Sequence, residues 1–86
     1  MPHPLATHLA PIIDMEVPQL QSIVARWVVN ESDELERARY RVFGAGLRGL
    51  KERILKRPAP PSEEEVEIAI TAMLALAGRR ARDLRA

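Results

Sequence analysis

Residues 35–57, LERARYRVFGAGLRGLKERILKR, form the longest helix candidate of the chain and decide its fold. At about 100° per residue, this stretch places an apolar stripe on one side and mostly small residues on another. The stripe consists of Phe43, Leu47, Leu50 and Ile54, with Tyr40 at its edge. We therefore expect a helix over about residues 33–57 whose apolar side enters a helical core.

Three glycines, Gly44, Gly46 and Gly49, interrupt this stretch. Each glycine inside a helix costs about 1 kcal/mol relative to alanine, so an unbroken helix would lose roughly 2–3 kcal/mol. Either another backbone approaches the small side closely, or the GAG sequence is a kink between two shorter helices. Both explanations remain open at this point. The GAGLRG string lacks the Walker spacing and a preceding strand, so it does not indicate a phosphate-binding loop.

A helix over residues 18–30 is expected before the central stretch. Pro18 suits a first helical turn, where its missing N–H costs little. Trp27 lies on the apolar face of this helix, and we expect it to be the main core anchor; stacking on a base or ligand is the alternative. Ser32 or Asp33 then caps the central helix.

The last helix is expected to start at Ser62, because Ser62 and Glu65 have the spacing of a capping box. It either ends near Gly78 or continues into the arginine-rich tail. Residues 57–61, RPAPP, read as a stiff, extended linker between the second and third helices.

Residues 1–17 read as a proline-rich arm with at most one short helix, starting at Pro4 and stopped by Pro11. Its apolar side chains are too numerous for a free tail, and we expect them to pack on this chain rather than on a partner. The predicted fold is all-α: one helical domain over residues 1–86, a small bundle of three main helices with a proline-rich N-terminal arm.

A chain of this length is only marginally stable as an isolated monomer. With 86 residues and no cysteine, it has no disulfides and buries only about 60–65% of its unfolded surface. Oligomerisation or docking on a partner is the usual remedy. The last helix has a broader apolar face than one neighbouring helix covers. We therefore expect an interface with a second copy or another protein at Val66, Ile70, Met73 and Leu74.

The net charge of +1 hides separate blocks of charge. Four basic residues lie within roughly 80° of each other on the central helix, and we call them the basic stripe: Arg37, Arg41, Arg48 and Lys51. The stripe is either a solvated face balanced by acidic residues of the protein itself, a contact for an acidic protein partner, or a contact for nucleic acid phosphates. A helix-turn-helix with its second helix from Ser32 would turn acidic residues toward the DNA groove, which counts against it.

No group of residues in the sequence indicates catalysis, a metal site or a cofactor. The two histidines, His3 and His8, lack the further ligands that a metal needs. The acidic residues 63–67 are explained by the helix dipole and the capping box. Ser22, Ser32 and Ser62 have no histidine near them in sequence.

No signal peptide or membrane-length apolar run is evident, and the absence of cysteine fits the cytoplasm. We expect a non-enzymatic interaction protein, such as a regulator, inhibitor or accessory subunit, that forms a homodimer or joins a larger complex. It should use no cofactor, small-molecule substrate or membrane. The alternative is a small nucleic-acid-binding regulator of the transcriptional type that uses the basic stripe.

Overall fold

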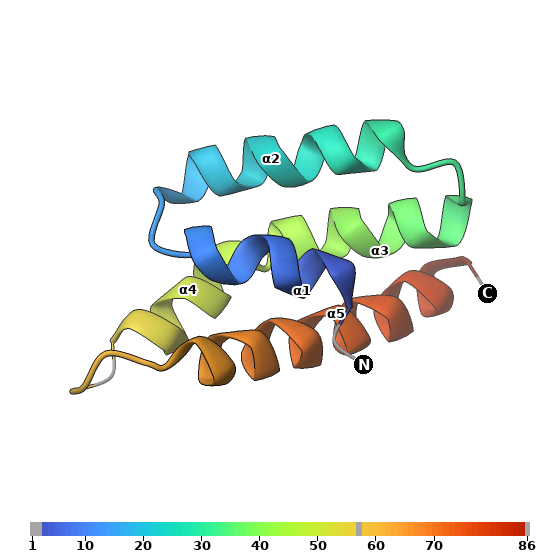
Figure 1. Ribbon diagram of the computed structural model, residues 1–86. Helices are drawn as coiled ribbons and strands as arrows, with labels where there is room; N and C mark the ends of the chain where they lie inside the picture. Colours follow the sequence, from blue (N-terminus) through green and yellow to red (C-terminus); the bar gives the residue numbers. More distant parts are fainter. Residues whose placement is uncertain (1–2, 57, 86) are drawn as a thin grey trace.

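The computed structural model describes residues 3–56 and 58–85 as a set of packed helices (Figure 1). The elements are α1 (Pro4–Leu9), the 3₁₀ helix η1 (Ala10–Ile12), α2 (Val17–Asn30), α3 (Glu34–Ala45), α4 (Leu47–Leu55) and α5 (Glu63–Arg85). The described residues contain no strand, which confirms the all-α prediction. The expected three helices become five α-helices, because the arm contains one and the central stretch contains two.

Helix α3 occupies the middle of the molecule, between α2 on one side and α5 on the other (Figure 1). Helix α1 and η1 cross the same face of this assembly and contact α5, while α4 turns away from the axis of α3. The radius of gyration is 12.5 Å, close to the roughly 12 Å expected for a folded chain of this length. The helices therefore pack around a common core.

The predicted apolar stripe of the central stretch is confirmed, since all four of its residues are buried. Every helix contributes to the same core. Its large buried side chains are Leu5, Leu9, Ile13, Leu20, Val24, Val28, Phe43, Leu47, Leu50, Ile54, Val66, Ile70 and Leu74.

The prediction for Trp27 is wrong, because this side chain is only partly buried at the edge of the core. The buried stripe of α2 runs through Leu20, Val24 and Val28. Trp27 lies about 60° away from Val24 around the helix, beside His8 of α1. Phe43, with no exposed surface, is the aromatic residue at the centre of the core.

The glycines of the central stretch have different roles. The helix breaks at Gly46, whose N–H donates to the carbonyls of Val42 and Phe43 at 3.2 and 3.0 Å as α3 ends. At Gly44 the packing is close, since a Cβ there would lie 3.3 Å from Cγ1 of Val24 on α2. The kink therefore occurs, whereas the close neighbour of Gly44 is a side chain and not the backbone that the other explanation expected.

Hydrogen bonds at the helix starts fix where the helices begin. The Asp33 side chain caps α3 by accepting from the N–H of Glu36 at 2.9 Å, which selects Asp33 over Ser32. The Ser62 hydroxyl accepts from the N–H of Glu65 at 3.2 Å, as the capping-box prediction requires of the serine. The start of α2 near the predicted residue 18 is also confirmed.

Helix α5 continues beyond Gly78 to Arg85, so the longer of the two expected helices is present. Ala81 in its last turns is completely buried, which holds this end on the core. A Cβ at Gly78 would lie 3.0 Å from Cδ of Arg39 on α3. The glycine therefore makes room for a neighbouring side chain instead of ending the helix.

The N-terminal arm packs on its own chain, as expected, through the buried Leu5, Leu9 and Ile13. Its one α-helix starts at Pro4, and Pro11 lies in η1. Residues 58–61 connect α4 and α5 without helical structure. Arg57, the first linker residue, and residues 1–2 of the arm lie outside the described residues. None of the helices within residues 3–56 and 58–85 combines the length and the apolar composition that a membrane span needs.

Candidate functional site: surfaces of α3, α4 and α5

The kink at Gly46 divides the basic stripe between two helices. Arg37 and Arg41 lie on α3 and line one shallow hollow of the surface. Arg48 and Lys51 lie on α4 and line another, which α4 shares with the start of α2. Arg41 and Arg48 are exposed.

Two residues of the basic stripe bind backbone carbonyls of their own chain. Arg37 donates from Nε to the carbonyl of Glu31 at 3.0 Å, which ties α3 to the loop before it. Lys51 donates from Nζ to the carbonyl of Asp14 at 3.1 Å and also to that of Met15. These two side chains therefore hold loops in place, and their charges are partly engaged within the protein.

Three of the four residues expected at an apolar interface lie inside this chain. Val66, Ile70 and Leu74 are 5%, 0% and 1% exposed. Met73 is partly buried and lies beside the kink, where its Cε would be 2.8 Å from a Cβ at Gly46. The broad apolar face of α5 is covered by several elements of the same chain, namely α3, α1, η1 and α4.

The opposite side of α5 carries a second, exposed apolar stripe. Ile68 is 62% exposed, and Ala72 and Ala75 are exposed with it. We call the outer face of α5 the surface made of Glu64, Ile68, Ala72, Ala75 and Arg79, all exposed and within about 80° of each other on the helix. The sequence contains the signal, because apolar residues continue around α5 beyond the buried stripe. Only burial by α3 and α1 shows which stripe remains free.

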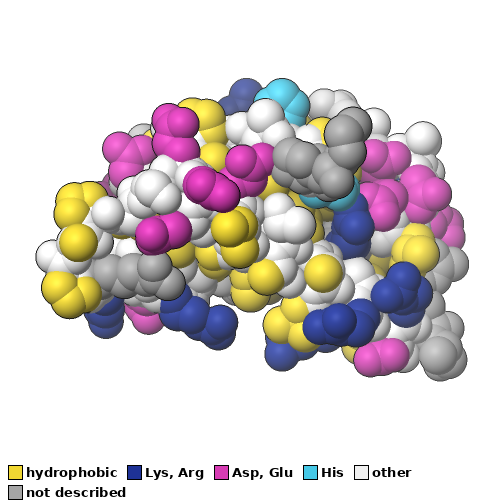
Figure 2. Space-filling model, turned by 60° about the horizontal axis from the view of Figure 1, so that its bottom comes forward, with side chains coloured by type: hydrophobic (Ala, Val, Ile, Leu, Met, Phe, Trp, Pro, Cys, Tyr) yellow, Lys and Arg dark blue, Asp and Glu magenta, His cyan; other side chains and the backbone are white. Residues whose placement is uncertain are grey.

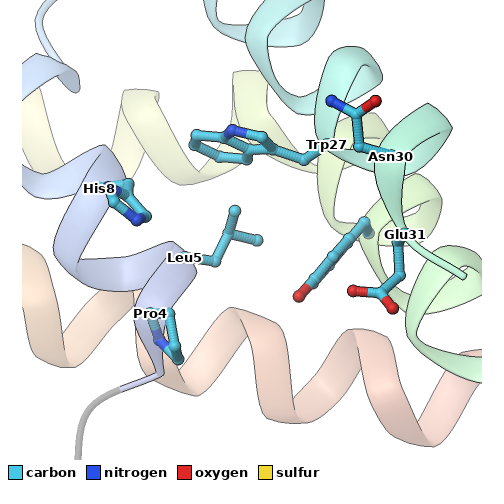
Figure 3. A pocket seen from close by; sticks show the side chains of 7 residues that line it. Pro4, Leu5, His8, Trp27, Asn30 and Glu31 are labelled. Atoms are coloured by element: carbon cyan, nitrogen blue, oxygen red, sulfur yellow. The ribbon is translucent and has the colours of Figure 1, made fainter. Parts of the chain in front are cut away.

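A hollow of about 250 Å³ lies between α1, α2 and α3 (Figure 3). It is lined by Pro4, Leu5, His8, Trp27, Asn30, Glu31 and Tyr40. The imidazole of His8 and the indole of Trp27 contact across it, with ring centroids 5.9 Å apart. Ligand pockets commonly measure about 300–1,000 Å³, so this hollow is smaller than most sites for small molecules.

Next to this hollow, a polar cluster attaches the start of α1 to α3. Arg39 donates to a carboxylate oxygen of Glu36 at 2.6 Å, and His3 contacts both side chains. The His3 ring meets the Tyr40 ring edge-on at 6.0 Å. Burial and the adjacent Arg39 charge lower the pKa of His3, whereas burial and the Glu36 charge raise the pKa of Tyr40. The cluster therefore favours a neutral histidine and a neutral tyrosine.

The described residues contain no group of three or more histidine, cysteine or acidic side chains placed to hold a metal ion. Comparisons of the chain with protein-family models, curated proteins and solved structures find no match. The surfaces themselves are therefore the basis for a functional proposal.

Proposed function

We propose that the protein is a small non-enzymatic binding protein, a regulator, inhibitor or accessory subunit, that presents the outer face of α5 to a macromolecular partner. The observation that supports this most directly is Ile68, a large apolar side chain 62% exposed on the longest helix. Ala72 and Ala75 beside it are small enough to let another helix approach to the usual 8–10 Å between axes. An exposed apolar residue among small ones suits docking of a helix or groove.

The alternative, nucleic-acid binding through the basic stripe, has less support. Its four cations lie on two helices that the kink separates. Arg37 and Lys51 donate to carbonyls of their own chain, which leaves Arg41 and Arg48 as the exposed cations of the stripe. Binding dominated by phosphate contacts normally uses several cations on one surface.

The proposal is tested with purified wild-type protein, Ile68→Glu and Val29→Glu as baits in an extract of the source cells. Val29 is the matched control, because it is 81% exposed but lies on α2. We expect the wild type and Val29→Glu to retain the same partner and Ile68→Glu to bind it at least tenfold more weakly, with unchanged circular dichroism. Full retention by Ile68→Glu would overturn the proposal.

Fluorescence anisotropy with a labelled random-sequence DNA duplex, and with a matching RNA, tests the alternative at low and physiological salt. We expect no micromolar binding. Binding that weakens steeply with salt, and disappears when Arg41→Glu and Arg48→Glu are combined, would favour the nucleic-acid function instead.

A further inference from the structure

The outer face of α5 changes from acidic to apolar to basic along the helix. On this face Glu64 lies in the first turn and Arg79 near the end of the helix, with Ile68, Ala72 and Ala75 between them. Figure 2 shows acidic and basic side chains on both halves of this face of the molecule, with hydrophobic side chains across its middle. At 1.5 Å per residue, the 23 residues of α5 span about 34 Å. If a second copy of this face is turned by 180° and laid against the first, the acidic end of each helix meets the basic end of the other.

We propose that the outer face of α5 binds the same face of a second copy, with the two helices antiparallel. This inference rests on the proposed function and identifies its partner. A two-fold axis near Thr71 and Ala72 places Glu64 opposite the partner's Arg79 and Ile68 opposite the partner's Ala75. Each of these pairs occurs twice, as a two-fold symmetric interface requires.

The apolar part of the face is what points to a bound helix. Acidic residues at a helix start and basic residues at its end also stabilise the helix dipole, so the charges alone do not require a partner. The dipole does not account for Ile68, which is 62% exposed one turn after Glu64. Opposite the partner's Ala75, Ile68 would bury this surface against a side chain small enough to receive it.

The charges select the antiparallel arrangement over the parallel one. In a parallel pair Glu64 would face the partner's Glu64, and Arg79 would face the partner's Arg79, which is destabilising. A contact between two helices of this length is smaller than the roughly 1,600 Å² of a standard interface. We therefore expect a dissociation constant in the micromolar range, and association that weakens as salt screens the end pairs.

Sedimentation of the full chain from 1 to 500 μM tests the pairing, with Glu64→Arg and Arg79→Glu measured separately and mixed. We expect the wild type to dimerise and each variant alone to associate at least tenfold more weakly. In either variant, position 64 of one copy faces a residue of the same charge at position 79 of the other. The equimolar mixture should recover dimers, since every side chain at position 64 then faces one of opposite charge at position 79 of the other variant. Val29→Glu should dimerise like the wild type.

A wild-type chain that stays monomeric throughout this range would overturn the inference, as would a mixture no more dimeric than the separate variants. Dimerisation unchanged in Ile68→Glu would also overturn it. The proposed function fails separately: it stands if Ile68→Glu loses another protein partner while the wild type is monomeric. It falls if Ile68→Glu alters neither kind of binding.

Discussion

At the scale of single residues, Phe43 and Trp27 show how position outweighs size. Phe43 has no exposed surface, whereas the larger Trp27 is partly exposed beside α1. We expect Phe43→Ala to lower the free energy of unfolding by about 3–5 kcal/mol, through lost burial and the cavity left behind. Trp27→Ala should cost less. Urea denaturation followed by far-UV circular dichroism measures both variants, and an equal loss would contradict this ranking.

We expect His3 to make the stability of the protein depend on pH. Burial and the Arg39 charge lower its pKa in the folded chain below the ordinary value of 6.5. The unfolded chain therefore takes up the proton first as the pH falls. The stabilising contribution of neutral His3 is complete above pH 6.5 and is lost as the pH drops from 6.5 through the lowered folded pKa. We expect a lower free energy of unfolding at about pH 5.5 than at about pH 7.5.

Substitution of the two histidines isolates this effect. In the wild type, the N–H of Leu5 donates to Nδ1 of His3 at 3.0 Å. The variant His3→Asn retains a side-chain acceptor for this N–H, but asparagine does not titrate. Its unfolding free energy should change less over the same pH interval. The matched variant His8→Asn should retain the His3 contribution. The wild-type slope persisting in His3→Asn would exclude His3 as its source.

At the scale of elements, the two glycines on either side of the kink should respond differently to alanine. A Cβ at Gly49 in α4 meets no atom within 4 Å, apart from its own helix backbone and chain neighbours, and the backbone is helical. We expect Gly49→Ala to raise the free energy of unfolding by about 0.5–1 kcal/mol, because alanine is the better helix former.

Gly44→Ala is the control for this substitution, since its Cβ would lie 3.3 Å from Cγ1 of Val24 on α2. It should gain less than Gly49→Ala or lose stability, as α2 and α3 are pushed apart. Thermal unfolding under identical conditions compares the two variants. A larger gain from Gly44→Ala would mean that α2 does not approach α3 closely there.

At the scale of the whole molecule, the N-terminal arm belongs to the same core as the long helices. Leu9 on α1 is completely buried, and His8 beside it contacts Trp27 on α2. We expect Leu9→Ala to lower the free energy of unfolding by about 2–5 kcal/mol, as for other core leucines. Trp27 fluorescence and far-UV circular dichroism should report one coincident transition. Two separate transitions, with Leu9→Ala shifting only the fluorescence, would make the arm an independent unit.

The sequence by itself determined the elements whose cause is local. The period of the apolar residues predicted the buried stripe through Phe43 and Ile54. Asp33 and Ser62 marked helix starts, because a short oxygen-bearing side chain caps the nearest free N–H groups. Pro4 and Pro11 limited the helix of the arm.

The tertiary structure decided everything that depends on which face meets which neighbour. Trp27 lies at the edge because Val24 occupies the close approach of α2 to Gly44. Val66, Ile70 and Leu74 are buried because α3 and α1 cover that side of α5, and Ile68 is left exposed on the other. A helical period gives the faces of each helix, but packing between distant segments selects the face that is buried and so the surface that remains for binding.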